Sequence, residues 1–98
     1  MRPRILLAGL GETGSELAQK LMLNWDVIAV DTNPETSSRL PVNDERCEAL
    51  RLHAGDATSA LVLRKANLEG VHAAVACTGS DEVNLEVLRL ARDLVGIQ

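Results

Sequence analysis

An apolar segment runs directly into a group of glycines near the start of the chain. Residues 4–8 read Arg-Ile-Leu-Leu-Ala, and Gly9, Gly11 and Gly14 follow at the spacing G-x-G-x-x-G. Such a segment is typical of a buried strand that turns sharply into a helix. Gly9 would permit the tight turn, and Gly11 would leave room for a pyrophosphate beside the N–H groups at the positive end of the helix. The sequence therefore predicts a dinucleotide-binding turn.

The third glycine, Gly14, can be placed on the predicted helix by counting about 100° per residue. Apolar residues fall within roughly 80° of Gly14 on either side: Leu17, Ala18, Leu21, Met22 and Trp25. Polar residues fall outside this arc: Glu16, Gln19 and Lys20. These positions predict an amphipathic helix over residues 12–24 with Gly14 at the centre of its buried face. A side chain at Gly14 would hold the helix off the sheet.

A second apolar run, residues 27–30, lies between Asp26 and Asp31 and predicts a second strand that Asp31 closes. Asp31 stands about 20 residues beyond the glycines, where a carboxylate can accept hydrogen bonds from both hydroxyls of an adenosine ribose. No Arg or Lys follows Asp31 immediately, so we expect the site to prefer NAD(H) over NADP(H). The alternative is that Asp31 only caps a helix.

The rest of the chain alternates between helical and apolar segments. We expect helices over residues 34–40, 44–50, 59–67 and 81–95, and strands over residues 51–54 and 71–77. Strands and helices that alternate with short connections predict a Rossmann-like α/β fold. Its parallel sheet would have the strand order 3-2-1-4, with helices on both faces, which is half of a doubly wound fold. Residues 1–98 are expected to form a single domain.

Composition excludes several classes of function. The net charge is −4 and the ten Lys and Arg residues are scattered, which argues against nucleic acid as a partner. No apolar run is long enough to cross a bilayer, so a membrane connection would be made through a partner. Cys47 and Cys77 have no metal-binding spacing, and a reducing cytosol is the expected compartment. His53 and His72 have no carboxylate or second His at a useful spacing, so we expect no catalytic base there.

Four segments together resemble one family. Residues 9–14, Asp31, residues 55–58 (Gly-Asp-Ala-Thr) and residues 78–84 (Thr-Gly-Ser-Asp-Glu-Val-Asn) are similar to those of the TrkA-N domain, also called RCK, the regulator of K⁺ conductance. The resemblance covers essentially the whole chain. It implies a cytoplasmic domain that binds NAD(H), or ATP or ADP instead, and passes the bound state to a K⁺ channel or transporter through dimers or rings of dimers. The family domain usually carries two further strands and a helix beyond the last helix seen here.

The resemblance also implies roles for individual residues. Asp31 would hold the adenosine ribose, Asp56 and its two neighbours would line the adenine side, and Thr78 and Gly79 would face the phosphates or the second ribose. The expected cofactor-binding residues are Gly9, Leu10, Gly11, Glu12, Thr13, Gly14, Asp31, Thr32, Asp56, Ala57, Thr58, Thr78, Gly79 and Asn84. We expect no catalytic residue and no metal ligand.

Two of these assignments have structural alternatives. Asp56 would serve equally as the N-cap of the helix that follows it. Asn84 falls within the apolar arc of the last helix, where a buried amide needs partners. Those partners are either the backbone of the turn at residues 78–80, which we favour, or the ligand.

Three functions fit this sequence. The first is a ligand-sensing regulatory domain of a K⁺ channel or transporter, which requires no chemistry. The second is the cofactor-binding half of an NAD-dependent oxidoreductase, which would need a His, Lys or Tyr beside the nicotinamide. The third is a structural interaction domain with an empty nucleotide pocket, and NADH titration separates it from the other two.

The predicted edge strand, residues 71–77, suggests a dimer. It would present unpaired N–H and C=O groups, and the last helix would expose Leu88 and Val95. We therefore expect a symmetric homodimer built on this strand, this helix or both.

Overall fold

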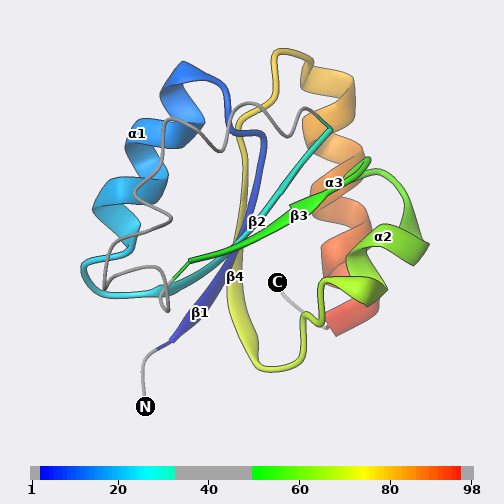
Figure 1. Cartoon of the computed structure of the whole chain (residues 1–98). Helices are drawn as coiled ribbons and strands as arrows, with labels where there is room; N and C mark the ends of the chain where they lie inside the picture. The colour runs from blue at the N-terminus through cyan, green and yellow to red at the C-terminus, as the bar shows by residue number, and fades with distance from the viewer. Residues whose placement is uncertain (1–2, 33–49, 96–98) are drawn as a thin grey trace.

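The computed structural model describes residues 3–32 and 50–95 of the chain (Figure 1). The elements are β1 (Arg4–Ala8), α1 (Glu12–Leu21), β2 (Asp26–Asp31), β3 (Leu50–Ala54), α2 (Ala60–Lys65), β4 (Val71–Ala76) and α3 (Asp81–Val95). The strands form a parallel sheet in the order β3-β2-β1-β4. The predicted fold class and strand order are therefore confirmed.

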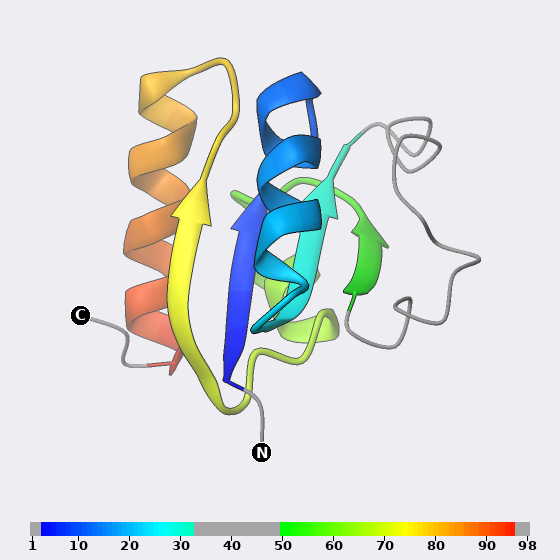
Figure 2. The same cartoon turned by 90° about the vertical axis from the view of Figure 1, so that its left-hand side faces the viewer.

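Helices cover both faces of this sheet. Figure 1 shows the sheet nearly edge-on, with α1 on one side and α2 and α3 on the other, and Figure 2 shows α1 crossing in front of the strands. Alternate residues of β1 serve the two layers, because side chains of a strand point to opposite faces. Ile5 and Leu7 pack into the cluster on the α1 side, while Leu6 and Ala8 pack into the cluster on the α2 and α3 side. Burial on both faces explains why β1 is apolar from Ile5 to Ala8.

The buried face of α1 is the predicted one, but the helix is shorter than predicted. Ala18 and Met22 are buried, and the polar residues predicted to lie outside the arc are exposed. The helix ends at Leu21 rather than at Asn24, so that part of the prediction is wrong. The N–H groups of Asn24 and Trp25 both donate to the carbonyl oxygen of Leu21, which forms a turn into β2.

The third strand begins earlier than predicted. Leu50 pairs with Val27 of β2, so the prediction of a helix that reaches residue 50 is wrong at that residue. Leu50 is 6% exposed, and the burial of its side chain against the α1 layer favours the strand over one more helical residue. The other residues of the two helices predicted over 34–50 lie outside the described part of the chain.

The elements after β3 lie close to their predicted bounds. Helix α2 runs from Ala60 to Lys65, shorter than the predicted 59–67, because the Ser59 hydroxyl caps its start and Asn67 takes a positive φ of 57° after its end. Strand β4 ends at Ala76, one residue early, and α3 has the predicted bounds. No described helix is long and apolar enough to span a membrane.

Candidate functional site

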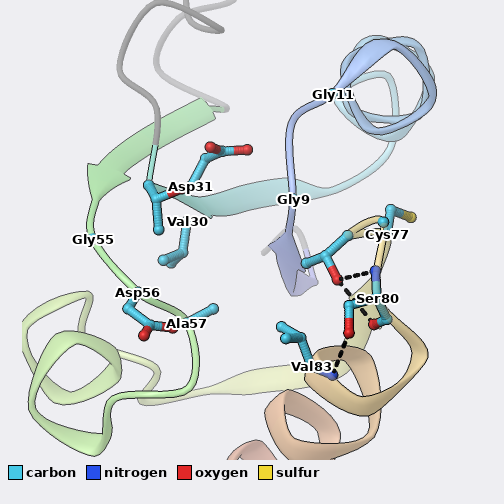
Figure 3. Close-up of a pocket in the computed structure, with 13 residues that line it drawn as sticks. Gly9, Gly11, Val30, Asp31, Gly55, Asp56, Ala57, Cys77, Ser80 and Val83 are labelled. Carbon is cyan, nitrogen blue, oxygen red and sulfur yellow. Dashed lines mark hydrogen bonds between the residues drawn. The ribbon is translucent and has the colours of Figure 1, made fainter.

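A pocket opens at the carboxyl ends of the strands, where parallel sheets usually bind their ligands (Figure 3). Its volume is about 530 Å³, within the usual range of about 300–1,000 Å³ for small-molecule sites. The lining residues are Gly9, Gly11, Val30, Asp31, Thr32, Gly55, Asp56, Ala57, Cys77, Thr78, Gly79, Ser80 and Val83. The turns after β1, β2, β3 and β4 all contribute to this lining.

Gly9 lies where two of these turns touch. Its φ is +96°, and its N–H donates to the carbonyl oxygen of Val30 at 2.9 Å. A Cβ atom at Gly9 would lie 2.9 Å from the backbone carbonyl carbon of Cys77 and 2.9 Å from the Thr78 nitrogen. Only glycine fits, because both the backbone angle and the space exclude a side chain.

The other two glycines have different surroundings. A Cβ at Gly14 would lie 2.0 Å from the carbonyl oxygen of Gly9, so α1 packs directly on the turn that precedes it. A Cβ at Gly11 would meet nothing within 4 Å. Gly11 is the N-cap of α1 and has no side-chain capping bond. The space beside this helix end is therefore free of described protein atoms, and the binding of a pyrophosphate there stays a prediction.

Asp31 connects β2 to the glycine turn. The half-buried Asp31 carboxylate accepts a hydrogen bond from the Leu10 N–H at 2.5 Å, and the Ser15 hydroxyl donates to the Leu10 carbonyl oxygen at 2.8 Å. The Leu10 side chain is buried in the α1 layer. Asp31 thus braces the turn after β1, which neither sequence-based interpretation included. Its role toward a ribose stays a prediction.

Asp56 follows β3 and is braced by Thr58. Its carboxylate oxygen accepts bonds from the Thr58 N–H at 2.8 Å and from the Thr58 hydroxyl at 2.6 Å. The bond from the Thr58 hydroxyl, and to a lesser extent the bond from the Thr58 N–H, hold the pKa of the Asp56 carboxyl below its usual value. The alternative that Asp56 caps α2 is wrong, because Ser59 does so.

The turn between β4 and α3 brings Thr78, Gly79 and Ser80 to the pocket. Asn84 lies in the first turn of α3, outside the pocket lining, and its side-chain amide forms hydrogen bonds with the backbone of Thr78. This arrangement agrees with the structural alternative for Asn84. In Figure 3, Ser80 and Val83 lie across the pocket from Asp56, and the sulfur of Cys77 points away from it.

The structure brings together most of the predicted site. Eight predicted residues line the pocket: Gly9, Gly11, Asp31, Thr32, Asp56, Ala57, Thr78 and Gly79. Others lie behind this lining or beside it: Leu10, Gly14, Thr58 and Asn84 in the contacts above, with Thr13 exposed in the first turn of α1. Glu12 begins α1, and its side chain lies outside the described set.

Sequence reasoning missed five lining residues: Val30, Gly55, Cys77, Ser80 and Val83. Gly55 and Ser80 carried a signal, since each belongs to a turn that directly follows a predicted strand. Val83 also lies in the segment 78–84 that resembles the family. Val30 and Cys77 carried no signal, because in the sequence an apolar residue at the mouth of a pocket cannot be distinguished from a core residue.

The charges of the described lining are uneven. Its carboxylates, Asp31 and Asp56, both stand at the β2 and β3 end. The other end presents the start of α1 at Gly11, the hydroxyls of Thr78 and Ser80, and the backbone of Gly79. The acidic end suits hydrogen-bond donors such as ribose hydroxyls, and the opposite end suits phosphates.

A parallel sheet in this order, with a pocket between the start of α1 and an acid at the end of β2, defines a Rossmann-type nucleotide-binding domain. Comparison with known families places the chain within this class. The model of the TrkA-N domain family matches residues 5–98, and the chain belongs to that family.

Curated relatives include a Trk system potassium uptake protein TrkA homolog of Archaeoglobus fulgidus, 37% identical over 82 residues. The match covers 84% of this chain and 18% of that protein. The Trk system potassium uptake protein TrkA of Vibrio alginolyticus is 30% identical, and the match covers 91% of this chain and 19% of that protein. The chain therefore spans less than a fifth of the length of these relatives.

Two solved structures show the same fold. The TrkA-N domain of the inner membrane protein ybaL from Escherichia coli has a TM-score of 0.75 at 22% identity, and the match covers all of this chain and 70% of that one. A GsuK channel bound to NAD has a TM-score of 0.72 at 21% identity, and the match covers 99% of this chain and 17% of that one.

Proposed function

We propose that this TrkA-N domain binds NAD(H) in the pocket at the carboxyl ends of the strands and acts as a ligand-sensing regulatory domain. The proposal rests on one observation. Asp31 and the open N-terminal end of α1 at Gly11 lie at neighbouring turns of the same pocket. An acid for the ribose and a helix N-terminus for the pyrophosphate are the two features that a dinucleotide requires.

The uneven charge of the lining supports one orientation of the ligand. The adenosine would lie toward Asp31, Thr32 and Asp56, with its hydroxyls near the Asp31 carboxylate. The pyrophosphate would lie at Gly11, and the second ribose would extend toward the turn at residues 78–80. The residues present fit such a ligand, whose nicotinamide would supply only an oxidation state to be sensed.

The alternative of an oxidoreductase has less support. The polar side-chain groups of the described lining are the carboxylates of Asp31 and Asp56 and the hydroxyls of Thr32, Thr78 and Ser80, while the Cys77 thiol points away from the pocket. A hydride transfer to a carbonyl substrate usually needs a general acid such as His, Lys or Tyr. We therefore propose a regulatory domain and not an enzyme.

Fluorescence titration of the purified chain with NADH tests the nucleotide-binding proposal. We expect saturable binding with a dissociation constant in the micromolar range. NAD⁺ should displace NADH, whereas displacement by ATP or ADP at lower concentration would favour an adenine mononucleotide as ligand. If none of these nucleotides binds at millimolar concentration, the domain is an interaction domain with an unused pocket.

The proposal for the partner of this domain rests on its relatives. Trk system potassium uptake proteins contain a matching segment, so we propose that this chain serves a K⁺ channel or transporter from the cytoplasmic side. It would contact the membrane through that partner subunit. The bound state of the pocket would reach the partner through the packing of neighbouring domains.

We also propose a symmetric homodimer on the outer surface of β4 and α3. Among the described strands, β4 pairs only with β1, so its other edge is open. A groove of about 600 Å³ lies beside it, lined by His72, Ala73, Ala74, Leu85, Leu88, Arg89 and Arg92. Leu85 is 69% exposed and Leu88 is 40% exposed, which agrees with the expectation for Leu88. The side chain of Val95 lies outside the described set.

The charges of α3 support a second copy as the occupant of this surface. The helix begins with Asp81 and Glu82 and has Arg92 in its last turn. Arg89 and Arg92 share one nearby carboxylate, that of Asp93, at 3.7 Å from each. Two copies of α3 packed antiparallel about a two-fold axis would place the acidic start of each near this arginine pair of the other.

Light scattering at micromolar concentration checks the dimer. We expect a dimeric mass for the wild type and a monomeric mass for Leu85→Asp, because the charge would be buried at the centre of the interface. Leu61→Asp is the matched control, since Leu61 is 62% exposed on α2 and lies away from the groove. A wild-type chain that stays monomeric contradicts the proposal.

A further inference from the structure

The amide of Asn84 fixes the backbone of one pocket residue. Its Oδ1 accepts from the Thr78 N–H at 2.9 Å and from the Thr78 hydroxyl, and its Nδ2 donates to the Thr78 carbonyl oxygen at 3.3 Å. Both backbone groups of Thr78 and its side chain are thus held by a single residue. Asn84 itself is half-buried and stands behind the pocket lining.

The bonds continue from Thr78 along the turn. The Ser80 N–H donates to the Thr78 hydroxyl oxygen at 3.2 Å, and the Val83 N–H donates to the Ser80 hydroxyl oxygen at 3.3 Å (Figure 3). The Asn84 N–H donates to the Ser80 carbonyl oxygen at 2.9 Å, which is a backbone bond of the first turn of α3. The turn that forms one end of the pocket is therefore fixed by hydrogen bonds among residues 78–84, and the Asn84 side chain supplies those that hold the Thr78 backbone.

Capping of α3 does not explain this asparagine. The Ser80 hydroxyl already accepts from the Val83 N–H at the start of the helix. Asn is also less favourable than Leu inside a helix, and this position lies on a largely apolar face. The only groups that Asn84 satisfies with its side chain in the described structure belong to Thr78. Its chemistry is specific, since the amide both donates and accepts, whereas a carboxylate only accepts.

We propose that Asn84 is a positioning residue for the phosphate and second-ribose end of the pocket, which it shapes through Thr78 without contacting the nucleotide. The inference rests on the proposed function. The adenosine end is built from β2 and β3, where Asp56 is braced by Thr58. The two ends of the pocket are thus held by separate sets of hydrogen bonds. A substitution at Asn84 should therefore affect only the end formed by residues 78–80.

Comparison of two ligands tests this separation. AMP reaches only the adenosine end and the start of α1, whereas NADH extends to the turn at residues 78–80. We expect Asn84→Ala to weaken NADH binding about tenfold, through loss of the hydrogen bonds that orient Thr78, and to leave AMP binding within twofold of wild type. Asn84→Asp keeps the acceptor and loses the donor, so its effect on NADH should be intermediate.

Conservative and matched variants complete the test. Thr78→Ser keeps the hydroxyl and should bind NADH as wild type does, while Thr78→Val should resemble Asn84→Ala. Asp31→Asn, at the other end, should weaken both ligands. Equal losses for NADH and AMP in Asn84→Ala, or no loss for either, would overturn the positioning role.

Amide hydrogen exchange gives a readout without any ligand. We expect the Thr78 N–H to exchange faster by at least tenfold in Asn84→Ala, while amides in the centre of β1 keep their wild-type protection. Unchanged Thr78 exchange contradicts the inference even if no nucleotide binds. Failure of the wild type to bind NADH or AMP, with Thr78 deprotected in the variant, would instead refute the proposed function alone.

Discussion

Replacement of Gly14 by valine is expected to lower the free energy of unfolding by about 3 kcal/mol or more and to weaken nucleotide binding at the same time. The added Cβ would lie 2.0 Å from the carbonyl oxygen of Gly9, which is backbone and has no rotamer that relieves the contact. Helix α1 must then move away from the turn after β1, which opens the pocket at Gly11. A loss of this size corresponds to a fall in melting temperature of roughly 12–24 °C for a domain of this length.

Thermal unfolding followed by circular dichroism measures this effect, and NADH titration below the transition measures the affinity. Gly11→Ala is the matched control, because a Cβ at Gly11 would meet nothing within 4 Å. That variant should melt close to the wild-type temperature and lose affinity only, since its methyl group enters the space proposed for the pyrophosphate. A Gly14→Val protein that melts and binds like the wild type would rule out the packing of α1 described above.

Asp31→Asn is expected to change the choice between cofactors. The wild type should prefer NADH over NADPH by about 100-fold, because a 2′-phosphate beside the Asp31 carboxylate meets a repulsion of up to about 4 kcal/mol at an effective dielectric constant near 20, partly screened by solvent. The variant keeps an oxygen that can accept from the Leu10 N–H. It should bind NADH about tenfold more weakly and bring NADPH to within about tenfold of it.

Calorimetric titration with both cofactors measures this preference. Asp56→Asn removes the other carboxylate of the described lining, and it should leave the ratio of the two affinities unchanged. Equal or tighter binding of NADPH by the wild type would show that Asp31 does not face the ribose.

The fold was predictable wherever several local signals agreed. The apolar run of β1, the glycine spacing and the arc of α1 all required a helix packed on a sheet, and α3 had acids at its start and a long apolar face. The order of the strands followed from right-handed crossovers together with the Rossmann pattern that the glycine spacing indicated. Glycine positions were the most informative, because the space that excludes a side chain at Gly14 depends on the motif and not on distant contacts.

Boundaries and long-range hydrogen bonds were not predictable in the same way. Leu50 belongs to β3 because it pairs with β2, and local propensity does not report such pairing. Asp31 braces Leu10 from 21 residues away, and Ser59 rather than Asp56 caps α2 although both types of residue are good caps. The sequence marked Asp31 and Asp56 as notable residues, but only the three-dimensional contacts reveal the hydrogen bonds by which they brace their turns.

The close approach of two turns at Gly9 limits how this pocket can diverge. Backbone atoms meet there, so a substitution of Gly9 cannot reshape the pocket without moving the two turns. We therefore expect variants with a new ligand preference to arise at lining positions that already carry a side chain, such as Thr32, Ala57 and Ser80. A library confined to these positions would sample altered specificity while leaving the scaffold of the site intact.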